Sequence, residues 1–201
     1  WIRNNASYTI DNAFTLDGGA IHAEDGTYDV SGNITLAAGG GTLSGKYNNK
    51  NPLFSGVISG AGDLTIDRLH GGSGDAAVRL SGTNTYTGNT ISRILNVTGA
   101  GSLGSGTYAG AIANSVTLTF DTSADQILSG VISGTGALTK SSTGTLALSA
   151  TNTYTGTTTI GAGTLSITDA GSLGSGTYAG AISNSGTLTF ATSAAQTLSG
   201  V

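Results

Sequence analysis

The residues that could do chemistry in this chain are few and widely separated. The 201 residues include two histidines, His22 and His70, seven basic and eleven acidic side chains, and no cysteine. A hydrolytic triad needs a nucleophile, a base and an orienting acid within reach of one another, and no serine here lies in a nucleophile-elbow motif. His22 alternates with apolar neighbours and is expected to point outward from a strand. The sequence therefore predicts a protein that is not an enzyme and has no cofactor.

The nearest approach to a catalytic or metal-binding set lies between residues 63 and 79. Asp63, Asp67 and Asp75 are carboxylates close in sequence to Arg68 and Arg79. Polysaccharide lyases combine clustered carboxylates for Ca²⁺ with a basic proton acceptor, so lyase chemistry is the alternative among enzymes. A solvated and partly paired surface explains the same residues. We therefore expect neither catalysis nor a metal site there.

These residues are carried by a sequence that repeats. Residues 98–131 return as residues 168–201, shifted by 70, with six differences. Two of the differences, at Asp121 and Asp125, replace a charge with alanine. The positions that stay apolar include Leu103, Tyr108, Ile112, Leu118, Phe120 and Val131. Units that cannot bury their apolar faces alone stack into a solenoid, so the recurring feature is predicted to be a buried pattern.

Short alternations of apolar and polar residues predict the strands. Phe14–Leu16, Ile34–Leu36, Leu64–Ile66 and Leu146–Leu148 are examples, and Gly-rich turns separate them. The alternations recur about every eight to fourteen residues, and no helical period competes, which predicts an all-β fold. A 70-residue unit would make about three coils of roughly 20–25 residues, stacked about 4.8 Å apart. A β-sandwich is the second choice, because it needs no such repeat.

The repeat divides the chain into one solenoid segment, 1–201, with three parts. Residues 1–54 are divergent coils, 55–128 form the first repeat, and 129–201 form the second. The first repeat carries six extra residues in a loop at 68–75. Insertions in solenoids project from one face and often carry binding specificity, so Arg68, His70 and Asp75 are the candidate contact residues. The Gly71–Asp75 stretch departs from the calcium-binding nonapeptide, because its aspartate comes one residue early.

Composition excludes several classes of function. Glycine, serine and threonine make up 90 of the 201 residues, and the net charge is −4. The basic side chains are scattered singly, so no nucleic-acid partner and no membrane insertion are expected for this segment. The absence of cysteine suits a chain that is exported unfolded. The sequence begins without methionine and stops within a repeat, so we expect a fragment of a longer array.

The second repeat carries an ordered series of short motifs. Residues 136–149 read GALTKSSTGTLALS, residues 152–156 read NTYTG, and residues 163–165 read GTL. The series resembles the autotransporter-associated β-strand repeat of bacterial surface proteins, over about residues 55–201. The first repeat departs from it, with Ile66 in place of the lysine and no GTL within Asn89–Leu95. The resemblance implies a right-handed parallel β-helix, secretion to the outer surface, and a role in adhesion, aggregation or display without catalysis.

The alternation and the repeat predict an all-β solenoid. The resemblance implies that it is a right-handed parallel β-helix that acts as an extracellular structural or adhesive rod on the bacterial cell surface. The expected partners are further copies or repeats of the same kind, and a glycan or host-cell surface. The alternative is a glycan-binding module whose contact is the 68–75 loop. Flat Thr-x-Thr ladders raise a third possibility, ice binding, although the pairs recur irregularly. Tyr86 and Tyr154, in the repeated NTYTG, are expected to pack inward with bonded hydroxyls, with sugar stacking as the alternative.

Overall fold

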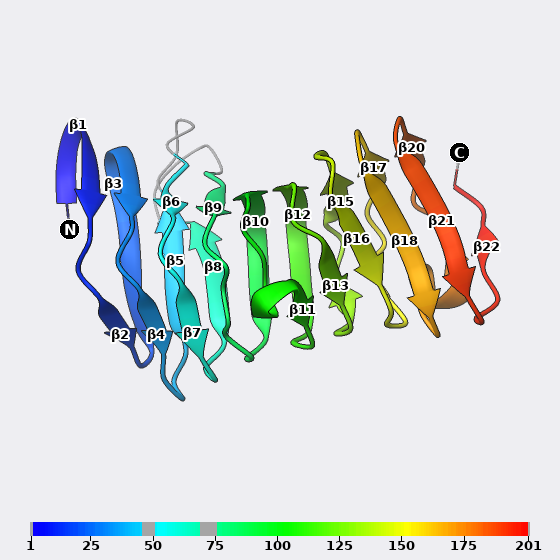
Figure 1. Ribbon diagram of the computed structural model, residues 1–201, viewed down its shortest axis with the longest axis horizontal. Helices are drawn as coiled ribbons and strands as arrows, with labels where there is room; N and C mark the ends of the chain where they lie inside the picture. The colour runs from blue at the N-terminus through cyan, green and yellow to red at the C-terminus, as the bar shows by residue number, and fades with distance from the viewer. Residues whose placement is uncertain (1, 46–50, 69–75, 201) are drawn as a thin grey trace.

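The chain winds into coils that lie side by side along one axis (Figure 1). The computed structural model describes residues 2–45, 51–68 and 76–200. Within these residues every strand pairing is parallel, and each pairing joins strands of successive coils. Three faces surround a common interior. The predicted parallel β-solenoid is therefore confirmed, and the sandwich alternative is wrong because a sandwich would need antiparallel pairs.

Each face is a ladder of short strands. The first face holds β2 (Phe14–Leu16), β4 (Ile34–Leu36), β7 (Ile58–Gly60), β11 (Thr107–Tyr108), β13 (Gln126–Leu128), β16 (Thr145–Leu148), β18 (Thr164–Asp169) and β21 (Thr187–Thr192). The second face holds β5 (Gly41–Gly45), β8 (Leu64–Arg68), β14 (Ile132–Ser133), β19 (Thr177–Tyr178) and β22 (Thr197–Leu198). The third holds β1 (Ile2–Ile10), β6 (Leu53–Phe54), β9 (Val78–Leu80), β15 (Ala137–Lys140), β17 (Thr158–Ile160) and β20 (Ile182–Asn184). Three long strands, β3 (Gly19–Val30), β10 (Thr90–Gly99) and β12 (Ile112–Thr122), run from the second face round a corner into the third.

The length of a coil can be read from the inward residues of the third face. They are Ile10, Val30, Phe54, Leu80, Val97, Phe120, Lys140, Ile160 and Asn184, each paired with the next. This column marks eight turns. Its shortest step runs from Leu80 to Val97 and its longest from Phe54 to Leu80, which makes coils of 17 to 26 residues. The predicted length of 20–25 residues is close to this range.

Equivalent residues of the two repeats lie on different faces. Leu64 lies in β8 on the second face, whereas its counterpart Leu138 pairs with Leu118 on the third. Leu95 lies on the third face, whereas Leu165 in β18 lies on the first. A repeat therefore completes three turns and then advances by one further face. The predicted three coils per repeat fall short by this third of a turn.

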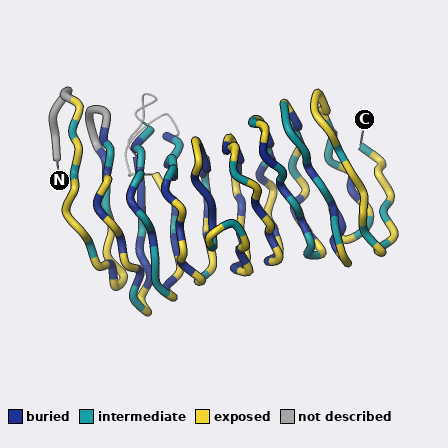
Figure 2. Tube along the Cα trace, in the orientation of Figure 1, coloured by how far each residue is buried: buried dark blue, intermediate teal, exposed yellow. Residues whose placement is uncertain are grey.

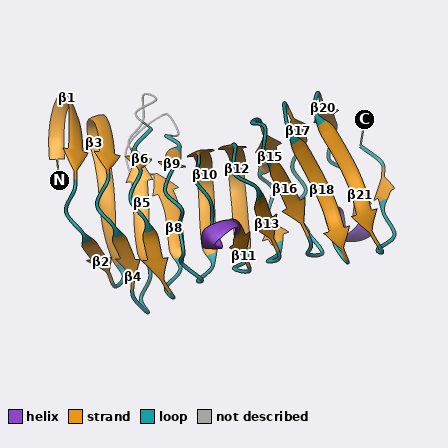
Figure 3. Cartoon of the chain, viewed as in Figure 1, coloured by secondary structure: helices purple, strands orange, loops and turns teal. Residues whose placement is uncertain are grey.

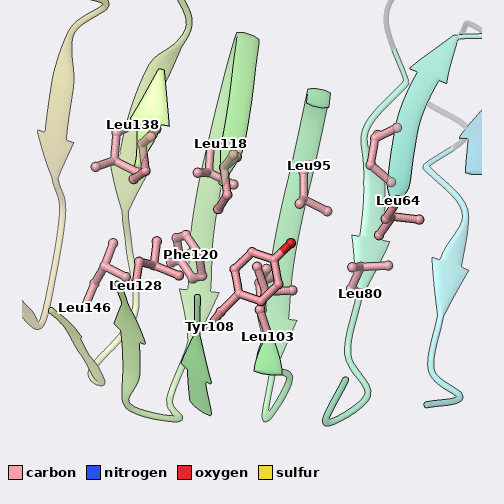
Figure 4. Close-up of a cluster of buried hydrophobic side chains, with 14 of the residues drawn as sticks. Leu64, Leu80, Leu95, Leu103, Tyr108, Leu118, Phe120, Leu128, Leu138 and Leu146 are labelled. Atoms are coloured by element: carbon pink, nitrogen blue, oxygen red, sulfur yellow. The ribbon is translucent and has the colours of Figure 1, made fainter. Parts of the chain in front are cut away.

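The interior is a continuous stripe of aliphatic and aromatic side chains (Figure 4). Along the trace, buried residues alternate with more exposed ones (Figure 2). Predicted core residues such as Leu103, Ile112 and Leu118 are fully buried. Burying one such side chain contributes about 1.5–3 kcal/mol of hydrophobic free energy. The expectation for Val131 is wrong, because this side chain is 37% exposed and its neighbour Ile132 enters the interior instead. Phe190 is exposed because β21 pairs only with β18, among the described residues.

Outward positions carry the hydroxyl ladders that the sequence suggests. Thr119, Thr139 and Thr159 are paired in register on the third face. Asn96 and Ser183 occupy the adjoining positions of this row, so the threonine ladder spans three coils. Short left-handed turns interrupt the ladders of the first and second faces, at η1 (Gly104–Gly106) and η2 (Gly174–Gly176) (Figure 3). Ser105, with φ of 55°, holds a backbone conformation that favours glycine.

Candidate functional site

The predicted contact loop is only partly within the described chain. Arg68 is the exposed last residue of β8, and its backbone N–H donates to Asp67 Oδ1 at 2.7 Å. His70 and Asp75 lie outside the described residues. His22 is half-buried and its Nδ1 lies 2.5 Å from Ser44 Oγ in the next coil, so this histidine is tied to the wall of the solenoid and does not point freely outward. The candidate residues are therefore not brought together in the described chain.

A groove lies immediately beside the root of that loop, at the corner where the second face meets the third. We call it the corner groove. Its volume is about 460 Å³, within the range of small-ligand sites. It crosses four successive coils, contributed by β8, β10, β12 and the β14–β15 connection. Its lining residues are Thr65, Ile66, Asp67, Ile91, Ser92, Arg93, Ala113, Asn114, Ser115, Gly134 and Thr135.

The pairing register arranges this lining in rows along the solenoid axis. One wall is an outward row in which Thr65 pairs with Ile91 and Ile91 pairs with Ala113. The floor is the adjacent inward row, in which Ile66 pairs with Ser92 and Ser92 with Asn114. The register of β10 and β12 shifts just beyond Ser92, where both strands turn the corner. The bend hollows the outer surface and creates the groove.

The floor of the groove is unusual because small polar residues occupy core positions. Ser92 and Asn114 are each 1% exposed, yet Ser92 Oγ and Asn114 Oδ1 have no hydrogen-bond partner. The amide nitrogen of Asn114 does donate to Ala137 O, at 2.9 Å. An unsatisfied buried polar atom costs about 1–3 kcal/mol. The second repeat avoids one of these costs, since the residue equivalent to Ser92 is the fully buried Ile160.

The walls combine apolar, hydroxyl and charged groups. Ile91 is 51% exposed, which is unusual for isoleucine, and Ala113 is exposed beside it. The opposite wall takes one residue from each coil, and these include Asp67 and Arg93. One carboxylate and one guanidinium leave the groove without net charge. The groove therefore offers an apolar strip flanked by hydroxyls to a ligand that is itself neutral.

Two buried hydrogen-bonded triads are the most regular polar feature of the interior. Thr158 Oγ1 lies 2.8 Å from Tyr154 Oη and 2.7 Å from Tyr178 Oη, and Tyr178 also donates to Gly156 O. The first repeat reproduces this arrangement with Tyr86, Thr90 and Tyr108 at the same distances. Burial raises the pKa of Tyr86, Tyr108, Tyr154 and Tyr178 above the ordinary value.

The inward position expected for Tyr86 and Tyr154 is confirmed, because both rings are fully buried and both hydroxyls are bonded. Each packs at a tilt on the tyrosine of the following coil, with ring centroids 5.3 Å apart for Tyr86 and Tyr108. Fully buried rings cannot offer a face to a sugar. The stacking alternative is therefore wrong for these two residues.

Lys140 is a buried cation in the aliphatic column of the third face. Its side chain is 1% exposed, between Phe120 and Ile160, and Nζ donates to Ser142 O. Burial lowers the pKa of the ammonium group, while Asp121 and Asp125 act in the opposite direction. The hydrogen bond to the Ser142 carbonyl gives the ammonium group a structural role at the corner that follows β15.

Two smaller pockets are copies of each other. The first, of about 160 Å³, and the second, of about 290 Å³, adjoin η1 and η2 and have matching linings. The two tyrosines of each triad belong to the lining. Each is smaller than the corner groove, and both lie below the usual size of a ligand site.

The described residues hold neither a metal-ligand cluster nor a membrane-spanning helix. Within 2–45, 51–68 and 76–200, no group of three or more histidine or acidic side chains could hold a metal ion. None of the helices in the described part of the chain has the length and apolar character of a membrane span. Asp63, from the lyase alternative, accepts a hydrogen bond from the Asn89 backbone at 2.7 Å. Asp67 accepts its bond from the next residue, so the two carboxylates serve turns of the backbone.

Sequence reasoning placed the candidate site in the loop and did not predict the groove beside it. The signal was nevertheless present, because Asn89–Leu95 lacks the GTL motif of the second repeat and puts Ser92 where Ile160 is expected. A polar residue at a core position of a repeat marks a local departure from stable packing.

Comparison with known proteins shows that part of this chain is similar to a known repeat family. Residues 73–92 and 138–167 match the sequence profile of the passenger-associated-transport-repeat family. The chain is also 35% identical, over 131 residues, to the adhesin BmaC autotransporter of Brucella suis biovar 1 (strain 1330). The alignment covers 60% of this chain and 4% of that protein, so the chain spans a small part of the relative's length. No solved structure matches the chain.

Proposed function

The chain contains passenger-associated-transport repeats of the autotransporter kind, as the resemblance predicted, and on that premise we propose that it is an adhesin-like rod displayed outside the bacterial cell. The rod holds binding surfaces away from the membrane and takes part in cell–cell or surface adhesion. Catalysis has no place in this function.

The observation that carries the proposal is the parallel stacking of coils over eight turns. Each turn uses 17 to 26 residues and adds about 4.8 Å of length, whatever the length of the array. Such a fold gains reach simply by adding copies. The near-identity of the two repeats, which differ at six of 34 aligned positions, is what a lengthened rod requires.

Self-association is the partner relationship that the geometry favours. The outer edge of the last coil presents β21 and β22, with Phe190 39% and Leu198 45% exposed. An unpaired strand edge with exposed apolar side chains is a template for further strands. We expect other copies of the chain to stack on this edge. A chain that stays monomeric in sedimentation runs across rising concentrations would contradict this expectation.

Adhesion itself is tested with beads coated with residues 1–201 through a single terminal attachment. We expect coated beads to cluster with one another, or to adhere to cultured cells, more than beads coated with an unrelated β-solenoid of similar charge. Equal behaviour of the two bead types would overturn the adhesive function. Glycan recognition is the second candidate, and the corner groove is the observation that favours it.

A further inference from the structure

We propose that the corner groove binds a neutral linear oligosaccharide that lies along the axis of the rod. The proposal rests on the second candidate function, glycan recognition. It places the contact on strands and not in the 68–75 loop. The residues that carry the proposal are Ile91, Ser92, Arg93, Ala113 and Asn114, all on β10 and β12.

The direction of the groove favours an elongated ligand. Its wall and floor rows cross the strands, because Ile91 pairs with Ala113 and Ser92 pairs with Asn114 in the next coil. A ligand in the groove therefore meets the same set of rows once per coil, about every 4.8 Å. This spacing is close to the length of one hexose unit in an extended glycan, so successive sugars would meet successive coils in equivalent ways.

An extended peptide fits this spacing less well. A β-strand rises about 3.3 Å per residue and alternates its side chains, so a peptide along the same axis would drift out of register with the coils. The groove lies on the outer surface at a corner, where the backbone groups of β10 are already bonded to β8 and β12. A peptide could not pair there as an added strand.

The chemistry of the walls suits a neutral sugar. Ile91 and Ala113 offer an apolar strip for the C–H faces of a pyranose ring, and the hydroxyls of Thr65, Ser115 and Thr135 border that strip. Asp67 and Arg93 balance each other's charge, so neither an acidic nor a basic polymer is favoured. Arginine and carboxylate groups also form charge-assisted hydrogen bonds with ligand hydroxyls.

The floor shows a departure from stable packing that the second repeat does not share. Ser92 leaves its hydroxyl unsatisfied, and Ile160 fills the equivalent position with an aliphatic side chain. A small floor residue keeps the corner hollow, and a larger one would raise the floor. A loss of stability confined to one copy of a repeat indicates a functional site.

The test uses residues 1–201 and an array of neutral linear glucose, galactose and N-acetylglucosamine oligomers of two to six units. We expect binding to at least one series, with affinity that rises up to about four units, because the groove spans four coils. Ala113→Phe fills the outer wall and should weaken binding by about tenfold or more. Ser183→Phe places the same ring at the equivalent exposed site of the second repeat and should change affinity by less than about twofold.

Circular dichroism is used to check that both variants are folded. Ile91→Thr is a milder variant, because it introduces the residue that the second repeat has at this position, Thr159. The proposal is overturned if no oligomer binds, if affinity does not depend on chain length, or if the two phenylalanine variants behave alike. Tighter binding of extended peptides than of sugars would overturn it as well. A folded rod that binds no sugar would leave the adhesive function standing. Loss of bead adhesion with intact sugar binding would remove only the adhesive function.

Discussion

The hydrogen-bonded triad of the second repeat allows a sharp test of how neighbouring coils are held in register. Thr158→Val keeps the shape of the side chain and removes the hydroxyl that both tyrosines share. Tyr178 keeps its bond to Gly156 O, but Tyr154 loses the partner of a fully buried hydroxyl. An orphaned buried hydroxyl costs about 1–3 kcal/mol, so we expect the free energy of unfolding to fall by about 2 kcal/mol.

A second substitution separates the orphaned hydroxyl from the lost contacts. In the double variant Tyr154→Phe with Thr158→Val no hydroxyl is left without a partner, because both members of the bond become apolar. Replacing both partners can be nearly neutral, so the double variant should lose about 1 kcal/mol less than the sum of the two single variants. The first repeat offers the same cycle with Tyr86→Phe and Thr90→Val, whose bond has the same length.

The assay is urea unfolding followed by circular dichroism, together with amide hydrogen exchange in the coils on either side of the substitution. Hydrogen exchange is needed because solenoids open locally, and a change confined to one repeat can escape a global probe. Additive losses within about 0.3–0.5 kcal/mol would refute the reasoning. So would a Thr158→Val variant as stable as the parent chain, since the triad would then contribute nothing to the stacking.

Other consequences follow from buried polar groups and close packing. Asn152→Ala removes the acceptor of the Ile132 backbone N–H, so we expect a loss of about 1–3 kcal/mol in urea unfolding. Ser92→Ala removes an unsatisfied hydroxyl, and the same assay should show a gain of about 1 kcal/mol. Gly156→Ala would place its Cβ 2.2 Å from a backbone oxygen of the preceding coil, whereas Gly161→Ala meets nothing nearer than 3.8 Å; only the first should lower the thermal midpoint by several degrees. Burial raises the pKa of the four triad tyrosines, so the unfolded chain ionises from about pH 10 while the folded chain stays protonated. Stability should therefore be constant just below pH 10 and fall above it, as tyrosinate absorbance and circular dichroism would show together.

The repeat and its alternation were enough to predict a parallel solenoid, because aliphatic residues two apart require one buried face and near-identical copies require one stacking mode. The burial of Tyr86 and Tyr154 followed from the same logic. Val131 was misplaced because it is apolar and stands beside Ile132: the two-residue alternation that buries Gln126, Leu128 and Gly130 continues to Ile132 and leaves Val131 on the outside.

The position of the groove could not be read from the sequence in the same way. It depends on a register shift between β10 and β12 and on the corner that both strands turn beyond Ser92. Neither feature has a residue signature of its own. The inserted loop was visible in the sequence as six extra residues, and its first residue, Arg68, ends the strand that carries Asp67 into the groove.

Each repeat advances by three turns and one further face, so adding repeats does not enlarge one uniform surface on a single side of the rod. Leu64, Leu138 and the residues around them show that equivalent surfaces of successive repeats look out from different sides of the rod. A flat surface of identical ladders, which ice binding would need, cannot build up on one side, and the threonine ladder of the third face accordingly ends after three coils. Only every third repeat would return a given site to the same side, about ten coils and about 48 Å farther along. Under the proposed function, differences between copies, such as Ser92 in place of Ile160, would therefore set where on the rod a ligand binds, and the added copies would set how far from the cell it is held.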